Sequence, residues 1–544
     1  MKRLAFVIPW YGENISGGAE AELRGLAHHL QDAGVELEIL STCVKDFRSD
    51  WSVNYHKPGI ENCAGISVRR FPVRKRDTTR FDEVNAKFMS GVAVSAEEEN
   101  LFMREMVNSP ELNKYIREYK SEYELFIFIP YMFGTTYYGV QECMEKAILI
   151  PCLHDEAYAH MGLFKDVFSR VAGMAFLSDP ERLLAETLYG VRGESFPFLG
   201  AGVDTDFSSD ALRFRRKYEI EEPFILYAGR KDAGKRVDEL IRHFVEFKKR
   251  NPSGLKLVLI GGGDIEIPSG DIIDLGFVSA QDKYDAYAAA TVFCNPSEME
   301  SFSIVIMESW LAEVPVLVNG KCEVTKDFAK KANGGLYYTS FVEFEGCLNY
   351  LLSHPATAKV MGKSGRSFVL ANFAWDAIVA KYRCYFEIMG RRCNGQETAT
   401  QICTSENDAS NLNERPLGLS FPDSGNAQDL VAALLVFADF QRGYAKTSRL
   451  RIIPRDENSR ALASVLCREL MISDMVNICN AVGRTAYRTD ICLIPRDCEA
   501  ASENDTSPEE MESAACRVVI DRFDHDKNMK SLKQAADMLR TEEE

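Results

Sequence analysis

Short apolar segments that alternate with helical segments are the feature that most constrains the fold of this chain. Residues 3–8 (RLAFVI) and 35–42 (VELEILST) predict strands, and the segment between them predicts a glycine loop that opens an amphipathic helix. Further apolar strands are predicted over 123–130, 147–152 and 171–178. Strands rich in Ile, Val and Leu that alternate with helices indicate a parallel sheet with helices on both faces.

A second series of the same kind begins near residue 223. A helix is predicted over 235–251, where apolar residues recur every three or four positions, and another over 302–314. Strands are predicted over 223–229, 255–263, 272–279, 290–297 and 314–320. The sequence therefore predicts an α/β protein with two Rossmann-like, doubly wound domains that face a cleft.

Domain boundaries are expected where this pattern changes. The stretch 196–207 (FPFLGAGVDTDF) separates the two series, so an N-terminal domain is predicted over 1–195 and a second domain over 196–372. A polar stretch rich in Ser, Asn, Thr and Gly predicts a linker over 390–425. Residues 426–544 regain helix and strand patterns and predict a small accessory α/β region.

Composition and charge exclude several classes of function. The chain has 544 residues, of which 46% are hydrophobic and 27% charged, as in globular proteins of two or three domains. A net charge of −17 argues against nucleic-acid binding, which depends on clustered positive charge. Fifteen cysteines without C-x-x-C pairs indicate free thiols in a reducing compartment. No apolar run is long enough to span a bilayer, and the first apolar run breaks at Pro9, so a cytoplasmic protein is predicted.

Two cations and two carboxylates follow strands of the second domain. Arg230 and Lys235 come after a strand and at the start of a helix, whose positive end would help to hold a diphosphate. Glu300 and Glu308 stand eight residues apart, on either side of a strand-to-helix turn. Taken alone, the two cations are more typical of a solvated surface, and two glutamates at a given spacing are common. The order of these features along the chain is more specific.

Three stretches of the second domain follow one another in a specific order: GRKDAGKR (229–236), GFVS (276–279) and NPSEMESFSIVIMESW (295–310). This order resembles that of the retaining GT-B glycosyltransferases of family 4, whose hallmark is E-x7-E. The resemblance extends from SGGAEAEL (16–23) to FAWDAIVAKYRCYFEIM (373–389). It implies a GT-B fold in which the helix over 373–389 crosses back to the first domain.

The resemblance also implies roles for individual residues. The donor ribose would be bound by Glu308, the donor sugar by Glu300, the diphosphate by Arg230 and Lys235, and the backbone would approach the phosphates and the acceptor at Gly17 and Gly18.

One stretch departs from the family pattern, and one histidine matches it. The family often has Gly-Phe-Gly after the first glutamate, whereas this chain has Ser301-Phe302-Ser303, whose backbone N–H groups are still expected to approach the donor. His154 follows the strand over 147–152 and matches a histidine that contacts the donor sugar near the reacting carbon. Its neighbour Asp155 is expected to orient or charge it. Packing of His154 in the interdomain interface is the alternative.

Two D-x-D triplets, which bind metal in transferases of the other major fold, are interpreted as coincidental. Asp204–Asp206 lies in the predicted hinge, and Asp524–Asp526 lies too near the C-terminus to precede a catalytic domain. Arg230, Lys235 and the helix N-terminus would stabilise the negative charge on the leaving diphosphate. We therefore expect no metal and no cofactor, with the nucleotide-sugar as a co-substrate.

Six basic residues gather within 69–80 (RRFPVRKRDTTR) of this acidic chain. They are either a solvated loop or a surface that docks on anionic lipid headgroups or a lipid diphosphate acceptor, at the inner face of the membrane.

The sequence thus predicts a retaining, metal-independent hexosyltransferase that moves a sugar from a nucleotide-sugar donor to a glycan acceptor. The acceptor is expected to be lipid-linked, in the biosynthesis of a cell-surface polysaccharide such as lipopolysaccharide. The alternative is a non-catalytic nucleotide-sugar-binding scaffold or regulator that acts through a protein partner of 426–544.

Overall fold

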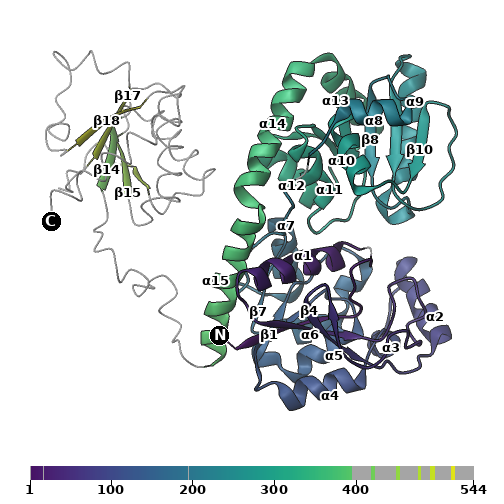
Figure 1. The fold of residues 1–544 in the computed structure, drawn as a ribbon, viewed down its shortest axis with the longest axis vertical. Helices are drawn as coiled ribbons and strands as arrows, with labels where there is room; N and C mark the ends of the chain where they lie inside the picture. The colour runs from purple at the N-terminus through teal and green to yellow at the C-terminus, as the bar shows by residue number, and fades with distance from the viewer. Residues whose placement is uncertain are drawn as a thin grey trace. The chain divides into compact units, whose positions relative to one another are not determined.

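The computed structural model describes residues 2–394, except positions 16, 194 and 207, and five strands further along the chain by their backbone (Figure 1). Two compact units follow from the contacts within the chain, Met1–Ile402 and Cys403–Glu544. The first unit contains the two predicted Rossmann-like domains.

The first domain is built on a seven-stranded sheet in the order β3-β4-β2-β1-β5-β6-β7. Its strand pairs are parallel, except that the edge strand β3 runs antiparallel to β4. The strands are β1 (Arg3–Ile8), β2 (Leu37–Thr42), β3 (Gly59–Cys63), β4 (Ile66–Phe71), β5 (Tyr123–Phe128), β6 (Ala147–Leu149) and β7 (Gly173–Met174). Strands β3 and β4 were not predicted. Strand β3 is exposed and lacks an apolar pattern, and β4 contains Arg69 and Arg70, which were assigned to a basic stretch.

Helices cover both faces of this sheet, as the burial of successive residues of β1 on both faces requires. Leu4, Phe6 and Ile8 pack into one buried cluster, and Ala5 and Val7 pack into another on the opposite face. The helices are α1 (Gly18–Asp32), α2 (Thr78–Met89), α3 (Ala96–Glu105), α4 (Pro110–Tyr119), α5 (Gly134–Glu142), α6 (Gly162–Phe168) and α7 (Asp179–Tyr189), with 3₁₀ turns η1 (Met144–Lys146) and η2 (Ala157–His160).

The second domain is built on a six-stranded parallel sheet in the order β10-β9-β8-β11-β12-β13. The strands are β8 (Phe224–Ala228), β9 (Lys256–Ile260), β10 (Ile272–Gly276), β11 (Val292–Asn295), β12 (Val316–Asn319) and β13 (Gly335–Tyr338). The helical elements are α8 (Ala211–Tyr218), η3 (Ala233–Lys235), α9 (Val237–Arg250), α10 (Ala280–Ala289), α11 (Ile304–Leu311), α12 (Glu323–Ala332), α13 (Phe341–Ser353) and α14 (Pro355–Asn372). The order reverses direction at β8 and β11, and in such sheets ligands bind beyond the carboxyl ends of the strands at that point.

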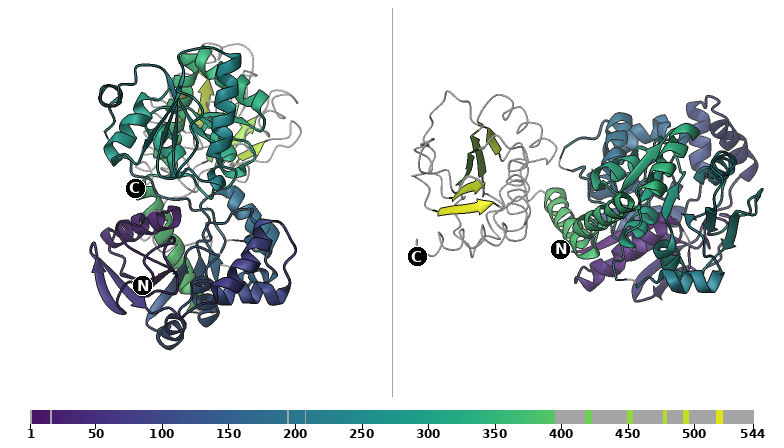
Figure 2. Two further views of the ribbon diagram at one scale, coloured as in Figure 1. Left: turned by 90° about the vertical axis from the view of Figure 1, so that its right-hand side faces the viewer. Right: turned by 90° about the horizontal axis from the view of Figure 1, so that it is seen from above.

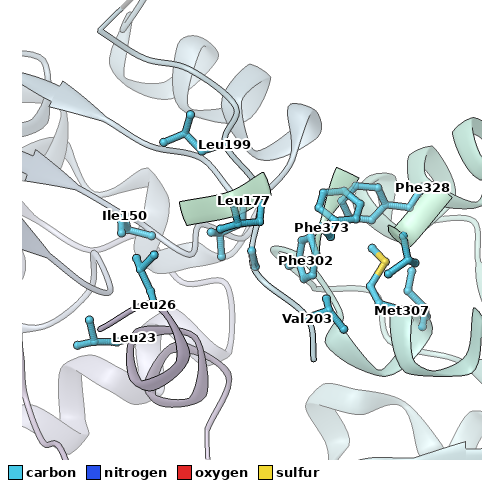
Figure 3. Close-up of a cluster of buried hydrophobic side chains, with 14 of the residues drawn as sticks. Leu23, Leu26, Ile150, Leu177, Leu199, Val203, Phe302, Met307, Phe328 and Phe373 are labelled. Carbon is cyan, nitrogen blue, oxygen red and sulfur yellow. The ribbon is translucent and has the colours of Figure 1, made fainter. Parts of the chain in front are cut away.

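A continuous buried cluster joins the two domains (Figure 3). Leu177 and Leu199 belong to the first domain and the connecting segment, and Phe302 and Phe373 belong to the second domain and the start of the crossover. The connecting segment is also held by hydrogen bonds, since the indole N–H of Trp375 donates to Asp204 Oδ1 at 2.7 Å. The first Asp of that D-x-D triplet therefore has a structural contact.

Helix α15 (Trp375–Cys393) packs against the first domain after the second domain has ended. Its Phe386 ring contacts Phe6 of β1, and the Tyr385 hydroxyl donates to the Ser195 carbonyl at 2.8 Å. Both views place α15 beside α1 (Figures 1 and 2). The crossover helix therefore lies where the sequence placed it and extends past the predicted end at 389.

The second unit contains a five-stranded sheet in which every pair is parallel. Its order is β16-β15-β14-β17-β18, that is 3-2-1-4-5 within the unit, which matches the first five strands of the doubly wound order 3-2-1-4-5-6. The strands are β14 (Gly418–Pro422), β15 (Arg449–Ile453), β16 (Val476–Ile478), β17 (Ile491–Pro495) and β18 (Cys516–Ile520). The central strand β14 lies inside the predicted linker 390–425, so that prediction was too long at its C-terminal end; at its other end α15 runs on to Cys393. The predicted decoy Asp524–Asp526 lies outside the described residues.

Two general features concern the described residues alone. None of their helices combines the length and the apolar character needed to cross a membrane. The nine cysteines within residues 2–394 are all free thiols.

Candidate active site

The residue pattern of the second domain converges on the carboxyl ends of β8, β9 and β11. The loops after β8 and β9 touch backbone to backbone, since a Cβ on Gly261 would lie 2.0 Å from the Gly229 carbonyl oxygen. Lys231 fixes this contact: it is 5% exposed, its Nζ lies 2.5 Å from Asp274 Oδ1 on β10, and its N–H donates to Gly262. The loop that was predicted to bind the diphosphate is therefore held in place by a buried lysine. The sequence did not single out this lysine.

Lys235 and Glu300, predicted separately for the diphosphate and the donor sugar, form one ion pair. Lys235 Nζ lies 2.8 Å from Glu300 Oε1, and both side chains are partly buried. Arg230 is the more exposed cation of the loop, with Asp232 at 3.5 Å. The structure thus brings Lys235 and Glu300 together and leaves the Arg230 guanidinium largely in solvent.

Glu308 lies in α11 with both carboxylate oxygens engaged. Its Oε1 accepts from Lys283 Nζ at 2.5 Å and its Oε2 accepts from the Tyr287 hydroxyl at 3.0 Å, both from α10. Only 7% of Glu308 is exposed, which is unlike an ordinary surface glutamate. Lys283 and Tyr287 were not predicted, because their helical spacing of four residues says nothing about a partner more than twenty residues away.

The turn between Glu300 and Glu308 is held by hydrogen bonds from the end of β11. Asn295 Nδ2 donates to Ser303 Oγ at 2.9 Å, and Asn295 Oδ1 accepts from the Ser297 N–H at 3.1 Å. Ser303 has φ 73°, in the left-handed region that favours glycine. This positive φ explains why the family pattern often has a glycine at this position. In this chain a serine adopts the conformation, and its hydroxyl accepts a hydrogen bond from Asn295.

The ring of Phe302 points away from the site. It is 3% exposed and contacts the rings of Phe328 and Phe373 edge to face, with centroids 5.4 and 5.0 Å away (Figure 3). Its side chain therefore belongs to the core that joins the domains, and only its backbone is left for the predicted approach to a donor.

Two helices point uncapped N-termini at this region. The N-cap residue of α9 is Arg236 and that of α11 is Ser303, and neither side chain caps its helix. The N–H groups of a first turn carry partial positive charge and bind anions readily. The arrangement suits a phosphate near Lys235 and the turn at 301–303.

Phe277 is an exposed aromatic residue at the rim of the same loops. It follows β10, is 80% exposed, and its ring lies over Gly262, where a Cβ would meet it at 2.5 Å. A side chain at position 262 would collide with this ring, so the glycine leaves room for it. Phe277 of the GFVS stretch therefore presents a flat apolar surface at the rim of these loops.

In the first domain the glycine loop is shaped by its own helix. A Cβ on Gly17 would lie 1.9 Å from Glu20 Oε2, whereas one on Gly18 would meet nothing within 4 Å. Glu20 accepts from the Trp10 indole at 2.5 Å, and Arg24 donates to the Gly12 carbonyl at 2.9 Å. A side chain at position 17 would therefore displace the Glu20 carboxylate, whereas Gly18 leaves open space beside the backbone.

His154 lies in the loop after β6. The prediction that Asp155 orients or charges it is wrong. Asp155 is turned outward and pairs with His160 at 2.7 Å. The carboxylate near His154 is that of Glu156, whose Oε1 lies 3.8 Å from His154 Nδ1 and accepts from the Tyr131 hydroxyl at 2.8 Å. The Glu156 N–H donates to the His154 carbonyl at 2.9 Å, so the chain turns at Asp155 and brings Glu156 back beside His154.

The basic stretch 69–80 is not a solvated loop in the structure. Arg69 and Arg70 lie on β4 and pair with Glu38 and Glu61. Arg74 pairs with Glu105, and Arg76 stacks over the rings of Trp51 and Phe81 and donates to the Glu105 carbonyl. Four of the six cations therefore have partners within the protein. The two that are left for a contact with an anionic surface are Lys75 and Arg80.

Metal ligands are not grouped in the described part of the chain, where no three His, Cys, Asp or Glu side chains are placed to hold an ion.

Known proteins resemble parts of this chain. Residues 209–368 match the family described as Glycosyl transferases group 1. The chain is 22% identical over 426 residues to an uncharacterized glycosyltransferase of Methanocaldococcus jannaschii, covering 72% of this chain and all of that protein. It is 26% identical over 255 residues to a GDP-mannose-dependent α-(1-6)-phosphatidylinositol monomannoside mannosyltransferase of Mycobacterium tuberculosis, covering 42% of this chain and 66% of that one.

A solved structure gives the fold. Sucrose-phosphate synthase from Thermosynechococcus elongatus superposes with a TM-score of 0.52 at 15% identity, over 72% of this chain and 99% of that one. The first 394 residues therefore have the GT-B fold, and residues 209–368 within them match the family of glycosyl transferases group 1.

Proposed function

We propose that this protein is a retaining glycosyltransferase that takes its sugar from a nucleotide-sugar donor without a metal ion. The observation that carries the proposal is the pair of glutamates: Glu300 and Glu308 flank one turn, and each is bound by a lysine of a neighbouring element. The similarity to nucleotide-sugar-dependent transferases supports the same function.

Donor binding would exchange partners in this site. A diphosphate between Arg230 and the uncapped N-termini of α9 and α11 would draw Lys235 from Glu300 and free that carboxylate for a sugar hydroxyl. Glu308, anchored by the Tyr287 hydroxyl, would accept the ribose hydroxyls. Each charge-assisted hydrogen bond contributes about 1.5–3 kcal/mol.

The transfer step would take place on one face of the sugar. The bond between the anomeric carbon and the diphosphate oxygen breaks, and an acceptor hydroxyl forms the new bond from the same side. Its proton passes to the leaving phosphate, whose charge Arg230 and Lys235 stabilise. His154 would contact the donor sugar near that carbon.

The acceptor is proposed to be a glycan on a lipid carrier, as in the assembly of a cell-surface polysaccharide. The mycobacterial relative that acts on a phosphatidylinositol mannoside supports this acceptor class. In such a reaction Lys75 and Arg80 are the cations of 69–80 left for an anionic headgroup. Sedimentation with vesicles of phosphatidylglycerol, but not of phosphatidylcholine, should depend on them; an unchanged Lys75→Gln/Arg80→Gln variant would exclude this contact.

Donor binding is tested by thermal stabilisation of the full chain with nucleoside diphosphates and nucleotide-sugars in the presence of EDTA. One nucleotide should raise the Tm of the wild type and of Glu323→Gln, an exposed control on α12, but much less that of Glu308→Gln. Release of nucleoside diphosphate from the matching sugar donor then separates an enzyme from a scaffold that binds without turnover. If no nucleotide stabilises the wild type, the proposal fails.

A further inference from the structure

A buried glutamate of the first domain, Glu181, connects two loops at the carboxyl edge of the sheet. It lies in the first turn of α7 and is 1% exposed. Its Oε2 accepts from the Leu177 N–H at 2.6 Å, just before that helix, and its Oε1 accepts from the Leu153 N–H at 2.6 Å, in the loop after β6. One carboxylate thus joins the segments that follow the neighbouring strands β6 and β7.

The loop that Glu181 holds has a strained backbone immediately before His154. Cys152 has φ 51°, in the left-handed region, although it is not a glycine. Such conformations cost about 1–3 kcal/mol and persist where the surroundings impose them. The Leu153 N–H is the next backbone donor after this residue, and its bond to Glu181 fixes the direction in which the chain leaves the strained position.

A capping hydroxyl alone would have been enough for α7. Ser178 already caps the helix, since its hydroxyl accepts from the Glu181 N–H. The Glu181 carboxylate reaches past the cap to a loop 28 residues away in sequence. Complete burial of a carboxylate has a cost that two short hydrogen bonds only partly offset, and burial raises the pKa of Glu181 to about 7. A helix cap does not explain that cost.

We infer that Glu181 is a positioning residue, which holds the loop 151–154 so that His154 presents its imidazole toward the donor sugar. This inference rests on the proposed function for the role of His154, but not for the geometry. Glu181 touches no substrate; it acts through the backbone of Leu153 on the residue that follows it.

Other titratable groups surround Glu181 and could report on the same change. Cys152 and His154 lie on the loop itself, Glu20 and Glu22 face it from α1, and Tyr382 faces it from α15.

The first test observes His154 directly in the full chain. With ¹³C-labelled histidine, the signal of His154 is assigned by its loss in His154→Ala and then compared in Glu181→Gln and Glu186→Gln. Glu186 lies on the same helix, but its carboxylate meets Arg192 at the surface. The His154 signal should shift or broaden in Glu181→Gln alone; an unchanged signal overturns the inference, whether or not the protein turns over a donor.

The second test is a double-mutant cycle on turnover. Glu181→Gln should lower kcat by about 10–100-fold, while KM for the donor stays unchanged, because the nucleotide site lies on the other domain. In the His154→Ala background the same substitution should cause no further loss. An equal loss in both backgrounds would mean general destabilisation and would refute the inference. Glu181→Asp, which is one methylene too short to reach both N–H groups, should give the same pattern if Glu181→Gln fails to fold. Absence of turnover in the wild type would overturn the proposed function, and the histidine signal would still decide the role of Glu181.

Discussion

Replacement of one buried carboxyl group should change how the stability of this protein depends on pH. Glu22 lies on the inner side of α1 and is 3% exposed. Burial raises the pKa of Glu22 from the ordinary value of 4.5 to about 8, and the nearby N–H of Gly202 in the connecting segment opposes this only in part. The folded protein therefore keeps Glu22 protonated at neutral pH.

The sign of the effect follows from proton linkage. Between pH 4.5 and about 8 the folded state holds a proton on Glu22 that the unfolded chain has lost, so the free energy of unfolding falls as the pH rises. At about 1.36 kcal/mol per pH unit, the full interval corresponds to about 5 kcal/mol. Between pH 5.5 and 8.5, Glu22 should account for a loss of about 3 kcal/mol.

Glu22→Gln removes the titration and keeps the size of the side chain. Urea unfolding of the full chain at pH 5.5 and 8.5 should show that the variant gains stability over the wild type as the pH rises, by about 3 kcal/mol at most. Glu36→Gln serves as the control and should follow the wild type, because Glu36 is an exposed carboxylate in the loop between α1 and β2. The burial of Glu181 contributes in the same direction and remains in the variant, so some pH dependence persists.

The result that would refute this reasoning is a parallel pH dependence of wild type and Glu22→Gln. It would mean that the carboxyl group is already ionised in the folded protein, with water or a cation beside it.

Three further predictions concern the second domain. Phe277→Ala should weaken binding of a nucleoside diphosphate about 5–150-fold but leave inorganic pyrophosphate unaffected, because a base stacked on the ring contributes about 1–3 kcal/mol; calorimetric titration of both ligands would show it, and an equal loss for both would exclude stacking. Ser303→Gly should keep or raise the Tm, since glycine adopts φ 73° freely, whereas Ser303→Val should lower it; a lower Tm for the glycine variant would mean that the Asn295 hydrogen bond outweighs the strain. Lys231→Met should cost about 3–5 kcal/mol in urea unfolding by leaving Asp274 unpaired, and Lys231→Met/Asp274→Leu should recover part of it; no recovery would place the loss elsewhere.

Much of the architecture could be read from local patterns. The strand 3–8 has the predicted bounds, and a helix opens at the glycine loop as predicted, because apolar runs and glycine loops act within a few residues. The strand before Glu300 and the helix that carries Glu308 were also predicted, but each is two or three residues shorter at both ends than expected. A fully buried parallel strand must be apolar on both faces, so a short apolar run bounded by turn residues indicates it.

The partners within the site could not be read in this way. Asp155 was the nearest carboxylate to His154 in sequence, yet Glu156 lies beside it, because the direction of a side chain depends on the path of the loop. Arg70 looked like part of a solvated basic loop, yet it is buried on β4 and paired with Glu61. Nothing local distinguishes a cation in solvent from one that another strand neutralises.

The sequence by itself determined two doubly wound domains, their connecting segment and the two glutamates of the turn, since these depend on spacing and apolar periodicity. Only the tertiary structure decided that Lys235 pairs with Glu300, that Lys283 and Tyr287 bind Glu308, and that Glu22 and Glu181 are buried. Burial and pairing are set by elements that are distant in sequence, and the charge of a group depends on them more than on its neighbours along the chain.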